Sequence, residues 1–197
     1  MDITPTMVKE LRSKTGYGFK LCRDALKESN GDVDKAVEIL RKKGEGKAAK
    51  MSDRATNEGI IGSYIHFNKQ LGVIVEIATQ TDSLAQSDEV IEFADSVAMH
   101  IAFTKPTYIS REDVPEDVVE AEKKIYREGM EDSGKPDFVV DKIVTGKLDK
   151  FFEENCLLEQ KYIQNEDVTI GDWMKKIAAQ GHENVQVRRL HWLEVGK

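Results

Sequence analysis

The sequence predicts an α+β fold, in which a module of three helices precedes a small antiparallel or mixed sheet with helices on one side. Apolar residues recur at helical spacing before residue 44 and again after residue 87. Strand-like alternation is confined to segments 61–67 and 72–77 and to the C-terminal end. Because the C-terminal strand is expected to join the first two in an antiparallel or mixed sheet with helices on one side, the predicted class is α+β.

The first 44 residues are expected to form three short helices, with the module spanning 1–44. Thr4 can cap the first helix through its hydroxyl group. The second helix is expected to begin at Phe19. Asp32 can cap the third helix, and Gly44 is expected to close it.

Residues 45–58 are expected to be a linker between this module and the rest of the chain. The segment lacks a strong apolar stripe, and its Ala, Lys and Glu residues favour a helix whose charges stay in water. We therefore expect a partly helical linker.

The remaining residues, 59–197, are expected to form the α+β core, which begins with two strands. These strands cover 61–67 and 72–77, and the polar loop 68–70 between them suits a hairpin. A last strand over 184–195 is expected to join the same sheet.

The core is also expected to hold several helices. A long helix is predicted over 87–104 and a short one over 170–180. Between them, one helix is expected to stop at Gly134 and another to start at Pro136. Two consecutive helices joined by such a turn predict a helical hairpin over about 115–155.

Composition excludes several classes of function. Lys and Arg total 29 against 36 Asp and Glu, a net charge of −7, which disfavours a direct nucleic-acid binder. Cys22 and Cys156 lack CxxC spacing and the four histidines are scattered, so no metal site is expected. Reduced thiols fit a cytoplasmic protein. No apolar run approaches the roughly 20 residues of a membrane helix, and no secretory signal is expected at the N-terminus.

Motifs for cofactors and catalysis are also missing from the sequence. It contains no GxxxxGK[ST], GxSxG or HExxH pattern. We therefore expect that the protein binds no cofactor and does not catalyse the making or breaking of covalent bonds. Asp82, Asp88 and Glu89 fit a solvated first turn of a helix better than a catalytic acid pair. His100 fits a structural histidine better than a ligand. A small enzyme that uses Asp82 or His100 remains the minority hypothesis.

The segment 80–85 marks a junction between a strand and a helix, and two interpretations stay open. In the first, Thr81 or Asp82 is only a helix cap and Leu84 packs locally. In the second, an exposed turn of helix presents Asp82 and its neighbours to a partner.

Several short motifs follow one another along the whole chain, at residues 8–12, 15–18, 30–32, 35–36, 47–50, 80–82, 98–102, 105–106, 134–136 and 184–189. Their order resembles the bacterial elongation factor Ts family, whose members are guanine-nucleotide exchange factors for elongation factor Tu. The length resembles the short form of the family, which has one core repeat.

The resemblance implies a mechanism without catalytic residues. In the family, an Asp-Phe turn inserts between two helices of elongation factor Tu and disturbs its Mg²⁺ and phosphate site. Asp82 occupies the Asp position here, whereas Ser83 replaces the Phe and Leu84 replaces the Val that follows. Ser83 also motivates an alternative, a binding-only relative that holds a Tu-like GTPase in another complex without efficient exchange.

The resemblance also implies docking surfaces for elongation factor Tu. The module 1–44 resembles a ubiquitin-associated domain that docks on the partner's nucleotide-binding domain. Leu11 matches a family contact position, and Phe19 and Lys20 stand where relatives often have two methionines. We expect Leu11 and Phe19 to form an exposed apolar patch.

Three further positions, Leu71, Gly72 and His100, match family residues that touch the partner near its phosphate loop. In two-repeat members these residues belong to the second repeat. A chain with one repeat would supply both surfaces as a homodimer, so a homodimer is expected.

Overall fold

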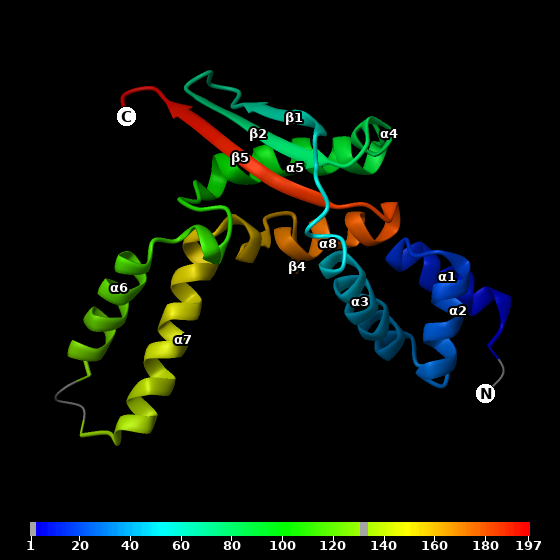
Figure 1. Ribbon diagram of the computed structural model, residues 1–197, viewed down its shortest axis with the longest axis horizontal. Coiled ribbons are helices and arrows are strands. Elements are labelled where there is room, and N and C mark those ends of the chain that lie inside the picture. Colours follow the sequence, from blue (N-terminus) through cyan, green and yellow to red (C-terminus); the bar gives the residue numbers. More distant parts are fainter. Residues whose placement is uncertain (1–2, 131–133) are drawn as a thin grey trace. The chain divides into compact units, whose positions relative to one another are not determined.

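The computed structural model describes residues 3–130 and 134–197, apart from the side chains at positions 45 and 47, and has the expected α+β fold (Figure 1). The helices and strands are α1 (Pro5–Thr15), α2 (Phe19–Glu28), α3 (Val33–Ala49), β1 (Glu58–Ile65), β2 (Leu71–Thr79), α4 (Asp82–Ala85), α5 (Asp88–Thr104), α6 (Glu116–Glu128), α7 (Asp137–Asn155), β3 (Lys161–Tyr162), β4 (Asn165–Thr169), α8 (Ile170–Gly181) and β5 (Val185–Glu194). No described helix is both long and apolar enough to cross a membrane.

The three N-terminal helices begin where the sequence predicts. The Thr4 hydroxyl accepts a hydrogen bond from the Met7 N–H, and the Asp32 carboxylate accepts one from the Lys35 N–H. These contacts satisfy N–H groups that a helix leaves without an internal partner. The residues that form the buried cluster of this module are Val8, Leu11, Tyr17, Cys22, Ala25, Leu26, Ala36, Leu40 and, from α8, Ala179.

The expected end of the third helix at Gly44 is wrong, because α3 continues to Ala49. Gly44 is buried inside the helix, and a Cβ atom at this position would overlap the hydroxyl group of Tyr17. Gly44 therefore makes room for the Tyr17 side chain and does not end the helix. The segment that follows α3 is only partly solvated, since Met51 is 6% exposed and Thr56 is 3% exposed.

Contacts divide the chain into two compact units. The first comprises Met1–Ile60, Ile77–Phe93 and Asp172–Gln186, and the second comprises the intervening segments and the C-terminal end. The first unit thus combines α1 to α3 with α4 and most of α8.

The main sheet has the strand order β1-β2-β5. The N–H of His66 donates to the carbonyl oxygen of Leu71 at 2.8 Å, beside the loop that joins β1 to β2. The N–H of Val195, just after β5, donates to the carbonyl oxygen of Gln70 at 2.9 Å, just before β2. These end-to-start pairings make the sheet antiparallel and confirm that the last strand joins the hairpin.

One face of the sheet is closed by α5. Val73 and Val75 are buried on this face of β2, each 1% exposed. Gly62 of β1 lies so close to α5 that an added Cβ would overlap the carbonyl oxygen of Ala94. The apolar stripe predicted for α5 is confirmed, with its members Val90, Ala94, Val97, Ala98 and Ile101 all buried.

The helical hairpin is confirmed as α6 and α7, but α6 ends earlier than expected. It stops at Glu128 with Gly129 as its C-cap, and not at Gly134. Residues 131–133 lie outside the described part of the chain. Gly134 has φ +64°, which places it in the left-handed region that glycine adopts without strain.

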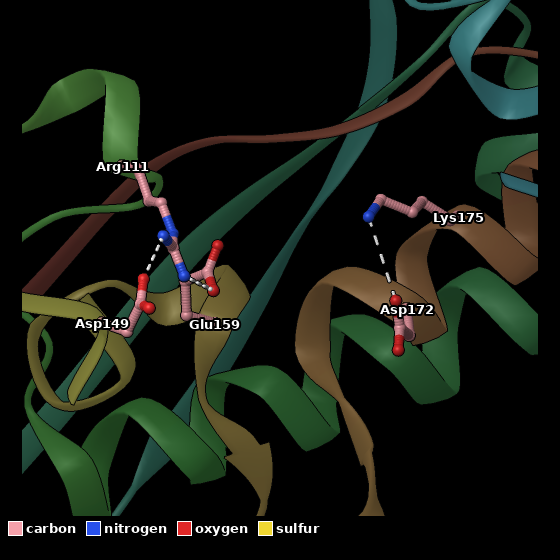
Figure 2. Close-up of polar contacts among 5 residues, drawn as sticks. All are labelled: Arg111, Asp149, Glu159, Asp172 and Lys175. Carbon is pink, nitrogen blue, oxygen red and sulfur yellow. Dashed lines mark hydrogen bonds and ion pairs between the residues drawn. The ribbon is translucent and has the colours of Figure 1, made fainter. Parts of the chain in front are cut away.

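Arg111 fixes the base of this hairpin between two carboxylates (Figure 2). Its guanidinium nitrogens lie 2.9 Å from an oxygen of Asp149 and 2.9 Å from an oxygen of Glu159. The guanidinium also lies 4.7 Å from the ring centre of Phe152. The Glu159 hydrogen bond, followed by that of Asp149, raises the pKa of Arg111.

The sequence did not predict the small second sheet, β3 paired antiparallel with β4. β3 has only two residues, and β4 begins with the polar run Asn165–Asp167. So short a pair has no alternating pattern to detect. It precedes α8, which was predicted and is confirmed.

Candidate functional site

The junction between β2 and α5 is built around Thr81, the N-cap of α4. The Thr81 backbone is extended at φ −126° and ψ 151°, and its Oγ1 accepts a hydrogen bond from the Leu84 N–H at 3.3 Å. The capping interpretation of this segment is therefore confirmed for Thr81. We call residues 81–85 the 81–85 turn.

Glu183, which follows α8, holds the other side of Thr81. The backbone N–H of Thr81 donates to a Glu183 carboxylate oxygen at 3.0 Å. The Thr81 hydroxyl donates to the same carboxylate at 2.8 Å. The Glu183 carboxylate thus accepts hydrogen bonds from both the backbone N–H and the hydroxyl group of Thr81.

Asp82 and Ser83 project from the turn into solvent. Both are exposed, and neither side chain has a hydrogen bond or ion pair within the described part of the chain. Leu84 is half-buried against α8, where an added Cβ at Gly181 would lie 2.9 Å from Leu84 Cδ1. The turn therefore packs through Leu84 and leaves its acidic residue available to another molecule.

The three candidates on the N-terminal module differ in exposure. Phe19 is 46% exposed at the start of α2, and Lys20 beside it is also exposed. Leu11 is fully buried in the cluster of α1 to α3. The expected apolar patch is therefore wrong for Leu11, because so small a module needs that side chain to close its own core.

Leu71 and Gly72 lie at the start of β2 and are half-buried. An added Cβ at Gly72 would lie 3.0 Å from Ile65 Cδ1, so the Ile65 side chain covers this glycine. A shallow hollow beside them is also lined by Leu193 of β5.

His100 is completely buried in α5, and its side chain does not reach the surface. Its Nε2 lies 2.9 Å from Oε1 of Gln160, and the Gln160 amide nitrogen donates to the Glu154 carbonyl oxygen. This second bond fixes the Gln160 amide, so Nε2 of His100 carries the proton. Among the residues that the structure describes, Nδ1 has no hydrogen-bond partner, and burial lowers the pKa of His100. The expected structural role is consistent with this burial.

The candidates are divided between the two compact units. The first unit holds Leu11, Phe19, Lys20, Asp82, Ser83 and Leu84, while the second holds Leu71, Gly72 and His100. Glu183 was not among the candidates, because nothing in the sequence links it to a threonine 102 positions away.

The described residues offer little for metal or nucleophilic chemistry. Over residues 3–130 and 134–197, no group of three or more His, Cys, Asp and Glu side chains could hold a metal ion. Cys22 and Cys156 are free and buried. Burial, followed by the charge of Glu159, raises the pKa of Cys156 to about 11, so this thiol stays protonated near neutral pH.

Comparisons with known proteins identify the family. The family model described as elongation factor TS matches residues 14–197. The elongation factor Ts of Thermosipho melanesiensis is 50% identical over 195 residues, covering 99% of this chain and 100% of that protein. The elongation factor Ts of Fervidobacterium nodosum is 49% identical over 197 residues, covering 100% of each chain. The chain therefore belongs to the elongation factor Ts family.

Proposed function

We propose that the 81–85 turn is the element with which this chain releases GDP from elongation factor Tu, by inserting near the Mg²⁺ and phosphate site of the partner. As a member of the elongation factor Ts family, the chain is a guanine-nucleotide exchange factor for elongation factor Tu. It acts in translation elongation, which takes place in the cytoplasm, and it makes or breaks no covalent bond.

Exchange without bond chemistry is a case of thermodynamic linkage. If the factor and GDP require different arrangements of one site, each weakens the binding of the other by the same factor. A carboxylate brought beside a bound nucleotide also raises the free energy of the GDP-bound state, because it repels the phosphates. An exposed acidic group on a fixed support can therefore promote the release of GDP.

The observation that carries the proposal is the state of Asp82. Its carboxylate is exposed and has no partner among the described residues, while Thr81 and Leu84 on either side are held by Glu183 and α8. An acidic group with a fixed backbone and a free side chain suits insertion into a partner. Ser83 is exposed next to it, and Leu84 contributes by fixing the turn.

For docking, we propose that the module 1–44 contacts the nucleotide-binding domain of elongation factor Tu. Phe19 and Lys20 are exposed and offer an aromatic ring and a cation to the acidic or apolar surface of a partner. Leu11 supports this surface from inside, since it is fully buried beneath the helices.

For the second contact, we propose that Leu71 and Gly72 face the partner directly and that His100 acts through the packing of α5. A chain with one core repeat would provide this second surface from another copy, so the proposal includes a homodimer.

An exposed apolar face of the sheet supports the homodimer. On the face opposite Val73 and Val75, Ile74 is 51% exposed. Ile61 and Ile65 of β1 are 63% and 58% exposed, and Leu193 of β5 is 82% exposed. Several large aliphatic side chains at such exposure on one sheet favour burial against an identical face related by a two-fold axis.

The homodimer is tested by placing a charge on this face. Ile74→Lys should convert the protein from dimer to monomer in sedimentation equilibrium. Ile125→Lys is the matched control, because Ile125 is 58% exposed on α6 outside the sheet. A wild-type protein that sediments as a monomer at micromolar concentration would contradict the homodimer.

The proposed role of the turn is tested by Asp82→Ala. GDP release from elongation factor Tu should slow by at least about tenfold, the size of effect that a hot-spot residue shows when truncated. Asp95→Ala is the control, since Asp95 is exposed on α5 and its side chain has no hydrogen bond or ion pair among the described residues. Equal release rates for the two variants would contradict the proposal.

A second candidate function rests on Ser83. A serine at this position buries much less surface than the family's Phe, so a binding-only relative would hold the GTPase without accelerating release. A stable complex of the wild-type chain with elongation factor Tu and an unchanged GDP release rate would favour this alternative.

A further inference from the structure

We propose that Glu183 is a positioning residue for nucleotide exchange, which holds the 81–85 turn in the orientation that presents Asp82. The inference rests on the proposed role of that turn, and it adds a residue 101 positions away from Asp82 in the sequence. It depends on contacts that lie entirely within the first compact unit.

The 81–85 turn needs support from outside itself. α4 has only four residues, which is one turn of helix. A single turn is unstable on its own, because fixing its backbone costs more free energy than its few hydrogen bonds return. The orientation of Asp82 is therefore set by what holds the two ends of the turn.

Glu183 holds the first end. Its carboxylate accepts the Thr81 N–H at 3.0 Å and the Thr81 hydroxyl at 2.8 Å. Because the hydroxyl donates to Glu183, its lone pairs remain free to accept the Leu84 N–H, which caps the helix. A charged acceptor makes these hydrogen bonds stronger than a neutral one would.

Glu183 is itself anchored through its neighbour Asn184, which is 5% exposed. The Asn184 N–H donates to the Gln80 side-chain oxygen at 2.8 Å. The Asn184 side-chain amide donates to the carbonyl oxygens of Ser52 and Arg54, at 2.8 Å each. The buried amide therefore fixes the backbone next to Glu183 and ties it to the segment that follows α3.

Leu84 and α8 hold the second end. The close approach of Leu84 to Gly181 leaves little room for the turn to shift. With this apolar contact intact, loss of the Glu183 carboxylate should loosen Thr81 and change the direction of Asp82 without unfolding the unit. The expected defect is thus in the exchange step and not in docking.

The experiment compares Glu183→Ala, Glu183→Gln and Glu153→Ala in the full-length chain. Glu153 is an exposed glutamate of α7 whose side chain makes no hydrogen bond or ion pair among the described residues, so Glu153→Ala should behave as wild type. At saturating factor, Glu183→Ala should slow GDP release from elongation factor Tu by about tenfold, as expected for loss of hydrogen bonds to a charged group. Its affinity for nucleotide-free elongation factor Tu should change by no more than about twofold.

Glu183→Gln should recover most of the release rate, because the amide oxygen can still accept the Thr81 N–H. In the free protein, the Thr81 and Leu84 amide hydrogens should exchange faster in Glu183→Ala than in wild type. If Glu183 had only a structural role, Glu183→Ala would lower the affinity for elongation factor Tu and the thermal stability together with the release rate. That result would overturn the inference.

A double variant separates this inference from the proposed function. In the Asp82→Ala background, Glu183→Ala should have almost no further effect on GDP release, since both changes remove one interaction. If Asp82→Ala slows GDP release but Glu183→Ala alone does not, the positioning role of Glu183 is wrong and the role of Asp82 stands. The same conclusion follows if the effects of the two substitutions on GDP release are fully additive in the double variant. If Asp82→Ala leaves the release rate unchanged, the proposed function itself is wrong.

Discussion

The hydroxyl end of Tyr17 occupies the space beside Gly44 that a side chain at position 44 would need. Tyr17 is 8% exposed and belongs to the same buried cluster as Leu11. Gly46, two residues further along α3, is exposed, and a Cβ at this position would meet no other described residue within 4 Å. Two glycines in one helix thus have opposite surroundings.

These surroundings predict opposite effects on stability. Gly44→Ala should lower the free energy of unfolding by about 1–3 kcal/mol, because the added methyl group forces Tyr17 to move. Gly46→Ala should raise it by about 0.5–1 kcal/mol, because alanine favours an exposed helix. Urea unfolding measures both, and a Gly44→Ala protein at least as stable as wild type would show that Tyr17 does not pack here.

The buried His100 predicts a pH dependence of stability. Burial lowers the pKa of His100 in the folded chain, whereas the unfolded chain titrates near the ordinary value of about 6.5. Below pH 6.5 the unfolded state binds more protons than the folded state, so the free energy of unfolding should fall as the pH drops below about 6.5.

His100→Gln should reduce this loss, because its amide can still donate to Gln160 but does not titrate. The measurement is the free energy of unfolding at pH 7.5 and at pH 5.5. His191→Gln, a change at an exposed histidine of β5, should keep the wild-type dependence. Identical losses in wild type and His100→Gln would mean that His100 is not buried as a neutral ring.

Removing the N-terminal module tests the division at residue 44. A chain of residues 45–197 should still unfold cooperatively, but at a lower temperature, because Ala179 of α8 loses the apolar cover of α1 to α3. Its affinity for elongation factor Tu should fall, since Phe19 and Lys20 are gone. Scanning calorimetry and titration measure the two effects, and a truncated chain without a cooperative transition would show that the core depends on the module.

Ser83→Phe tests whether residue 83 lies at the partner interface. An aromatic ring there can bury roughly 150–250 Å², far more than serine. Ser83 is exposed, so the change should leave the fold intact. We expect faster GDP release from a typical bacterial elongation factor Tu and a smaller gain with the cognate partner. An unchanged rate with the typical partner would remove residue 83 from the proposed wedge.

Much of the fold could be predicted from local patterns. Thr4, Asp32 and Thr81 cap helices as their side chains suggest, because capping depends only on residues a few positions apart. The stripe of α5 and the β1–β2 hairpin were equally local. The end of α3 was not predictable from Gly44, because a glycine that makes room for a distant ring looks the same in sequence as one that ends a helix.

The candidate site was only partly predictable. The family resemblance pointed to the 81–85 turn, and the structure adds that Asp82 is exposed there. The family resemblance could not reveal that Leu11 and His100 are buried, since burial depends on which helix face meets the core. Glu183 carried no signal at all, because its bonds to Thr81 arise only when α8 and β2 end side by side.

The central claim is tested most directly by stopped-flow release of fluorescent GDP from elongation factor Tu, measured against increasing concentration of the factor. Wild-type factor should accelerate release to a plateau. Asp82→Ala should reach a plateau at least about tenfold lower at a similar half-saturating concentration, because the docking surfaces remain. A plateau for Asp82→Ala equal to that of wild type would contradict the claim that the 81–85 turn carries out exchange.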